Sequence, residues 1–145
     1  MAELDDSDRP RGRTGGGRTH AANVAAVEAT YQLVLWLIPV LDAMPRRQKF
    51  QLGDRLQNSA IAVLDILIEA AYTRDRAALL QRANLDLEKL RFWIRLSKDL
   101  RLLAFPQYEH AARLIDNLGR QVGGWLKAER AARLPLPGAS DAKAP

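Results

Sequence analysis

Residues 24–41, VAAVEATYQLVLWLIPVL, decide the fold class of this 145-residue chain. Apolar side chains recur there at alternating steps of three and four residues, at Val24, Val27, Tyr31, Val34, Ile38 and Leu41. This spacing places them on one side of an α-helix and is typical of a helix in a bundle. We therefore predict a helix over residues 22–43, kinked near Pro39, whose nitrogen cannot donate a hydrogen bond.

Three further segments have apolar residues at helical spacing. They cover residues 47–72, residues 74–104 and a stretch that begins at Pro106. Four helices of similar length joined by short turns predict an all-α, antiparallel up-down-up-down four-helix bundle over residues 21–133. Residues 1–20 and 134–145 are poor in large apolar side chains and contain several glycines and prolines, so we expect two disordered tails.

The helix over 74–104 has apolar residues on two faces. Phe92, Trp93 and Leu96 lie on one face, and the second face carries Leu87, Leu90 and Ile94. One face packs the bundle and the other needs a partner, as does Trp36, which lies opposite the first helix's apolar side. We therefore predict a homo-oligomeric ring whose interface contains the following residues: Trp36, Leu87, Leu90 and Ile94.

The composition argues against catalysis and against a membrane span. The chain has no cysteine and two histidines, so no metal site or other cofactor is expected. Asp65 and Glu69 form a carboxylate pair at helical spacing, but a solvated helix face explains them better than acid–base chemistry. The apolar run from Leu33 to Leu41 is shorter than the roughly 20 residues of a membrane-spanning helix. We predict a cytoplasmic protein that is not an enzyme.

The charge distribution indicates an anionic partner. The formal net charge is +5, and residues 21–133 hold 17 basic and 12 acidic side chains, which accounts for the whole excess. Arg91, Arg95 and Lys98 form a stripe on one helix face, flanked by Arg101. We predict that they bind nucleic-acid phosphates with little base preference, because we expect Phe92 and Trp93 to face the bundle. The weaker candidates are Arg46, Arg47 and Arg120, and a solvated or protein-binding face remains an alternative for the stripe.

Three segments resemble the accessory variability determinant family of diversity-generating retroelements. The segment LRFWIRL at residues 90–96 resembles the LRFWLR segment of that family. Ile38-Pro39 with Met44-Pro45-Arg46-Arg47 resembles its proline-containing turn, and the residues around Gly119, Arg120 and Trp125 resemble its GRxxGxW pattern. The resemblance covers about residues 24–130 and excludes both predicted tails.

The resemblance implies a non-enzymatic four-helix bundle that assembles as a homopentamer. It further implies binding to a retroelement reverse transcriptase and to its template RNA or other nucleic acid, RNA or DNA, in support of mutagenic cDNA synthesis. An alternative is a protein-interaction bundle of the type encoded in 23S rRNA intervening sequences. The remaining rival is a small hydrolase that uses Asp65 and Glu69.

Overall fold

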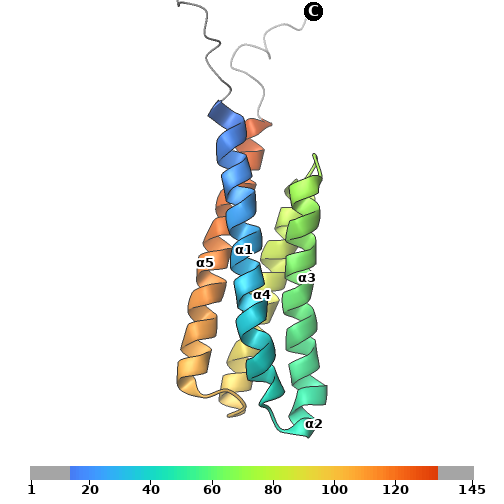
Figure 1. The fold of residues 1–145 in the computed structure, drawn as a ribbon, viewed down its shortest axis with the longest axis vertical. Coiled ribbons are helices and arrows are strands. Elements are labelled where there is room, and N and C mark those ends of the chain that lie inside the picture. The colour runs from blue at the N-terminus through green and yellow to red at the C-terminus, as the bar shows by residue number, and fades with distance from the viewer. Residues whose placement is uncertain (1–13, 134–145) are drawn as a thin grey trace, which may run out of the picture.

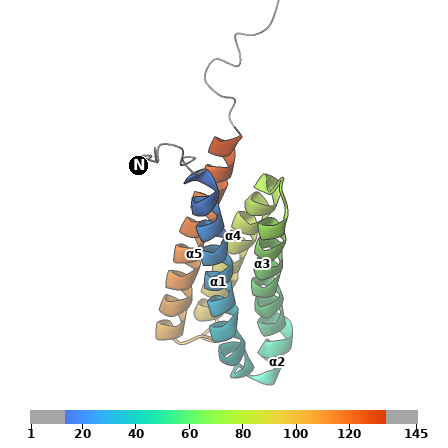
Figure 2. The ribbon, with the colours of Figure 1, turned by 45° about the horizontal axis from the view of Figure 1, so that its top comes forward.

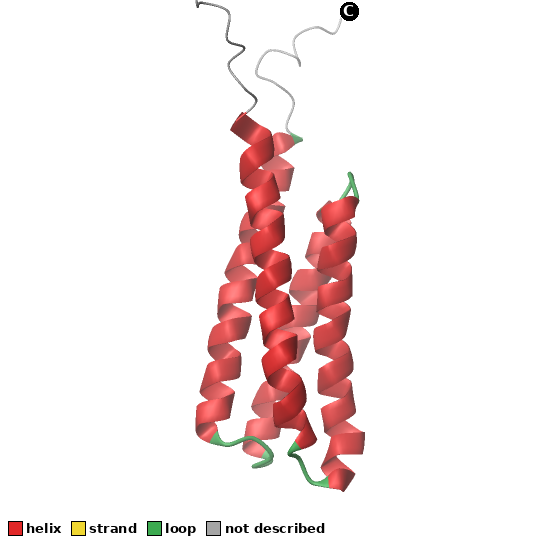
Figure 3. Ribbon diagram, in the orientation of Figure 1, coloured by secondary structure: helices red, strands yellow, loops and turns green. Residues whose placement is uncertain are grey.

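The computed structural model describes residues 14–133, which contain four long α-helices and no strand (Figure 3). These are α1 (Thr14–Asp42), α3 (Asp54–Tyr72), α4 (Ala77–Asp99) and α5 (Phe105–Ala132). A short helix, α2 (Arg46–Gln48), and a π-helical turn, η1 (Lys49–Gly53), connect α1 to α3. The four long helices lie side by side in an elongated bundle (Figure 1), in which α1 and α4 each pack against both α3 and α5.

The turns lie at the two ends of this bundle. The connection from α1 to α3 and the turn from α4 to α5 lie at one end, and the turn from α3 to α4 lies at the other (Figures 1 and 2). The C-terminal end of α5 reaches this second end, where Arg133 donates hydrogen bonds to Asp75 and to the carbonyl of Arg74. The short connections therefore place helices that follow one another in the chain side by side.

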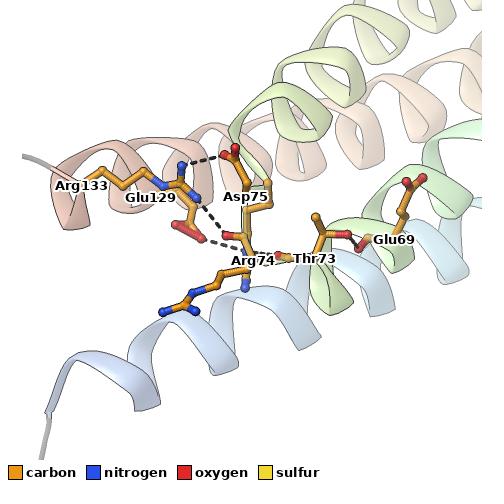
Figure 4. A network of polar contacts seen from close by, with 7 residues as sticks. Glu69, Thr73, Arg74, Asp75, Glu129 and Arg133 are labelled. Atoms are coloured by element: carbon orange, nitrogen blue, oxygen red, sulfur yellow. Dashed lines mark hydrogen bonds and ion pairs between the residues drawn. The ribbon is translucent and has the colours of Figure 1, made fainter.

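Polar contacts fasten the α3–α4 turn to α5, as Figure 4 shows. The Arg76 Nε lies 2.8 Å from the Glu129 carboxylate, and both side chains are largely buried, with 17% and 12% of their surfaces exposed. The same nitrogen donates to the carbonyl of Thr73 at 3.0 Å. Arg133 reaches Asp75 from α5 at 2.6 Å. Two arginines thus hold the turn in place: Arg76 at the start of α4 and Arg133 at the end of α5.

The core residue pattern of α1 corrects the sequence prediction. Leu41 is buried as predicted, but Leu33 and Leu37 of the adjacent row are buried too, whereas Val24 and Tyr31, which we predicted on the buried side, are 55% and 49% exposed. Both rows of apolar residues have helical spacing, so the period alone does not indicate which row faces the other helices. The buried row also contains Thr30, whose hydroxyl donates to the carbonyl of Ala26 at 2.7 Å.

The core residues of α4 overturn part of the predicted oligomer interface. Leu87, Leu90 and Ile94 are at most 1% exposed and belong to the hydrophobic core of the single chain. They are therefore inaccessible to a second copy, and their assignment to an intermolecular interface was wrong. The large apolar side chains that α4 turns to solvent are Leu85, Phe92 and Leu96, which are 52%, 65% and 40% exposed.

Several helix ends differ from the prediction. The third long helix ends at Asp99, before the expected residue 104, because Arg101 adopts a left-handed φ of 60°. The amide of Leu102 then donates to the carbonyl of Ser97 at 2.8 Å, which closes the helix end. At the other end of the chain α1 begins at Thr14, inside the predicted tail, and ends at Asp42, close to the predicted end at residue 43. The rest of the two predicted tails lies outside the described residues.

Among residues 14–133, one helix has the length and the apolar composition of a membrane-spanning helix. The stretch Asn23–Asp42 of α1 is apolar enough and long enough to cross a bilayer. The core helix of a soluble protein passes the same test. Here the inward row of this stretch, which includes Leu33, Leu37 and Leu41, packs in the hydrophobic core. One third of the stretch is buried in this way, as in an amphipathic helix with one face in the core.

Candidate nucleic-acid interface

The basic stripe of α4 lies on one face of the helix, and its first member is bound across the groove to α5. The Arg91 Nη1 pairs with the carboxylate of Asp116, and its Nη2 lies 3.5 Å from Glu88. The Arg91 side chain is 41% exposed, and the Nη2 atom lies 3.8 Å from the position that a Cβ would take at Gly119. Arg91 therefore fills the space above a glycine and joins two helices.

The other two members of the stripe share one carboxylate. The Arg95 Nε lies 3.9 Å from Asp99, and the Lys98 Nζ lies 3.3 Å from the same carboxylate. All three stripe cations thus have an acidic neighbour, which reduces their attraction for phosphate. The contacts of Glu88 and Asp99 with the stripe can be predicted from helical spacing, because these residues lie three or four positions from Arg91 and Arg95. Asp116 lies on another helix, so its distance along the sequence does not predict its pairing with Arg91.

The expectation that the stripe lacks an aromatic neighbour was wrong. Phe92 is 65% exposed and lines a small cavity of about 240 Å³ with Arg91, Arg95 and Tyr108. The Lys98 Nζ lies 4.6 Å from the centre of the Tyr108 ring. The sequence had placed Phe92 in the core because the two apolar faces of α4 could not be told apart. The stripe therefore includes aromatic rings on which a base could stack.

The remaining predicted cations lie in separate places. Arg101 is exposed at the end of α4, where its backbone conformation terminates the helix. Arg120 lines the groove between α4 and α5 with Arg91. Arg46 and Arg47 are exposed in α2, at the end of the bundle that holds the α1–α3 connection. The structure brings Arg120 and Arg91 into one groove, whereas α2, which carries Arg46 and Arg47, packs against η1.

Trp36 lies near the surface and packs against another helix of the same chain. It is half-buried, and its ring centroid lies 4.7 Å from that of His110 on α5. This contact gives the aromatic residue on the outer side of α1 a packing partner within the chain. Trp36 therefore contributes to the packing of α1 against α5.

The residues considered for chemistry lie on the exposed face of one helix. Asp65 and Glu69 are exposed on α3. Among residues 14–133, no group of three or more His, Cys, Asp or Glu side chains is placed so that it could hold a metal ion.

Comparison with known families places these features in context. A family model described as bAvd-like matches residues 24–129, which span the bundle from α1 to the last turns of α5. All the residues of the α4 stripe, together with Asp116, lie within the matched range. No curated protein matches the chain.

Proposed function

Because the chain belongs to the bAvd-like family of accessory variability determinants, we propose that it is a nucleic-acid-binding accessory protein of a retroelement reverse transcriptase. In this proposal it binds the enzyme and its template RNA in the cytoplasm and supports mutagenic cDNA synthesis without chemistry of its own. The observation that carries the proposal is the family match over residues 24–129.

The charge of the bundle supports binding to RNA. The net charge of +5 favours association with a polyanion, and Arg91, Arg95, Arg101 and Arg120 supply cations on or near the α4–α5 face. Arginine contacts phosphate through a planar fork of donors, which holds a backbone in a fixed orientation. We expect such contacts to position the RNA, with base preference supplied by the reverse transcriptase or by exposed aromatic rings.

The proposal includes an antiparallel up-down-up-down order of the helices and their assembly into a homopentameric ring. The outer sides of α1 and α3 carry exposed apolar side chains that support contact between copies: Val24, Tyr31, Leu35, Ile68 and Tyr72. Exposures from 41% for Ile68 to 90% for Tyr72 leave considerable apolar surface in water on the single chain. A second copy would remove that surface from water. The number five comes from the family resemblance.

One observation favours a second candidate function, a protein-interaction bundle without nucleic-acid binding. Each cation of the α4 stripe lies within 4 Å of a carboxylate, so the stripe itself has little excess charge. Such a mixed surface suits a protein partner. The two functions differ in whether the chain binds RNA when the reverse transcriptase is absent.

The test of the proposed function is reconstituted cDNA synthesis. A retroelement reverse transcriptase encoded beside this chain copies its template RNA with and without the purified protein, and the cDNA is sequenced. We expect the protein to increase the yield of cDNA that carries substitutions. Unchanged yield and unchanged substitution frequency at saturating protein would contradict the proposal.

A further inference from the structure

A groove of about 540 Å³ runs between α3 and α4, on the side of α4 that faces away from the Arg91 groove. Its α4 wall is formed by residues at steps of three and four, which include Arg82, Lys89 and Trp93. This spacing puts them on one face of the helix over about three turns. The groove is therefore extended along the bundle and is long enough for more than one small anion.

The groove carries excess positive charge. Three cations line it, Arg55 from α3 and Arg82 and Lys89 from α4, and the lining contains one carboxylate, Asp86. Arg82 lies 3.4 Å from Asp86. Within residues 14–133, Arg55 and Lys89 have no carboxylate within ion-pair distance. This contrasts with the α4 stripe, where every cation has an acidic neighbour.

Two aromatic rings complete the groove. The Arg55 guanidinium lies 4.3 Å from the centre of the Trp93 ring, so the half-buried tryptophan holds the arginine at the wall. Phe50 lines the same groove and is 62% exposed, so much of its ring is open to a ligand, with the Arg46 guanidinium 5.9 Å from the ring centre. Asn58 and Ser59 add neutral hydrogen-bonding groups to the α3 wall.

The π-helical turn η1 explains why Phe50 faces outward. A π-helical turn has a wider hydrogen-bonding ring than an α-helix and shifts the faces of the residues that follow it. Leu52 and Gly53 of η1 are buried against the core, while Phe50 and Gln51 are exposed at the groove. The backbone of η1 thus presents Phe50 at the cationic groove while Leu52 packs in the core.

We propose that the groove between α3 and α4 binds a single strand of nucleic acid, with phosphates on Arg55 and Lys89 and a base stacked on Phe50. Unpaired bases stack on aromatic side chains beside cations that follow the backbone, whereas a duplex hides the faces of its bases. The inference rests on the proposed function and adds to it the site and the single-stranded form of the ligand.

The test measures binding of fluorescein-labelled oligouridine, oligodeoxythymidine and an RNA duplex to the full chain by fluorescence anisotropy. The charge variant is Arg55→Gln with Lys89→Gln. Its matched control is Arg113→Gln with Lys127→Gln, which removes the same two residue types from exposed positions of α5. The ring variant is Phe50→Ala, and its control is Phe105→Ala, because these two rings are 62% and 61% exposed.

We expect the wild-type chain to bind the single strands more tightly than the duplex. The charge variant should lose about tenfold in affinity, and the slope of log affinity against log salt should fall by about 0.7 for each cation removed. Phe50→Ala should weaken binding several-fold at unchanged salt slope. Both controls should bind as the wild type does, with unchanged helicity by circular dichroism in every variant. A preference between oligouridine and oligodeoxythymidine then indicates whether RNA or DNA is the strand.

Three results would overturn the inference. They are duplex binding as tight as strand binding, groove variants that bind as tightly as the wild type, and uridine monophosphate that competes as strongly as oligouridine on a per-nucleotide basis. If the groove variants bind the strand normally and the chain still stimulates cDNA synthesis, the groove assignment fails and the proposed function stands. If the wild-type chain binds no nucleic acid, both fail.

Discussion

Asp116 of α5 holds the guanidinium of Arg91 of α4, so that a cation from the predicted phosphate-binding stripe is also a tie between two helices. Phosphate binding at this position must compete with a carboxylate that is already in place. The pair is half-exposed, which keeps its own contribution to stability small.

Removal of the stripe cations should therefore have a limited effect on nucleic-acid affinity. For Arg91→Ala with Arg95→Ala we expect a loss of about threefold or less, because both guanidinium groups already pair with carboxylates, of Glu88, Asp99 and Asp116, and are less available to contact phosphate directly. The measurement is anisotropy titration of oligouridine, with Arg55→Gln and Lys89→Gln as the comparison. A larger loss from the stripe variant than from the groove variant would make the stripe the principal phosphate site.

The Arg76–Glu129 pair should contribute measurably to stability. Both side chains are largely buried, so Glu129→Ala leaves the Arg76 guanidinium without its carboxylate and should lower the free energy of unfolding by about 1–3 kcal/mol. Urea denaturation measures the effect, and Glu109→Ala, an exposed glutamate of the same helix, is the control. Equal unfolding midpoints for the two variants would show that the pair stabilises nothing.

Arg101 should be replaceable by glycine with a gain in stability. Its φ of 60° is costly for a side chain with a Cβ, and glycine takes this conformation freely. We expect Arg101→Gly to raise the free energy of unfolding by about 0.5–1 kcal/mol. Arg101→Ala removes the same charge without the conformational relief and should give no gain. A destabilised glycine variant would mean that the arginine side chain itself holds the α4–α5 turn.

The exposed apolar side chains of α1 and α3 should carry the assembly. Tyr31→Glu with Ile68→Glu places two charges on the outer surface and should reduce the particle mass measured by light scattering toward that of one chain, at unchanged helicity. Phe105→Glu is the control, since this exposed ring lies on α5. A wild-type protein that is already monomeric at micromolar concentration, or an unchanged mass in the double variant, would contradict the assembly proposal.

The sequence predicted the number and approximate position of the helices because each has a clear apolar period. It could not choose between two apolar faces on one helix, and for that reason it put Leu87, Leu90 and Ile94 at an interface and Phe92 in the core. Which face is buried depends on the other helices, and this information is not local.

The site was harder to predict for the same reason. The spacing of Arg91, Arg95 and Lys98 along one helix predicted that they share a face, and in the structure they do. The pairing of Arg91 with Asp116, the contact of Arg55 with Trp93 and the groove that Arg55 and Lys89 both line depend on side chains from neighbouring helices. The left-handed conformation at Arg101 had no signal either, since glycine is the residue that commonly marks such a helix end.

The most direct test of the account is the mass of the complex formed with a retroelement reverse transcriptase and its template RNA. The three purified components are mixed and separated by size-exclusion chromatography with light-scattering detection. We predict one species that contains all three and whose mass exceeds that of the enzyme–RNA complex by a whole number of chains. Separate elution of the chain from both the enzyme and the RNA, at concentrations above those needed for cDNA synthesis, would contradict the central claim.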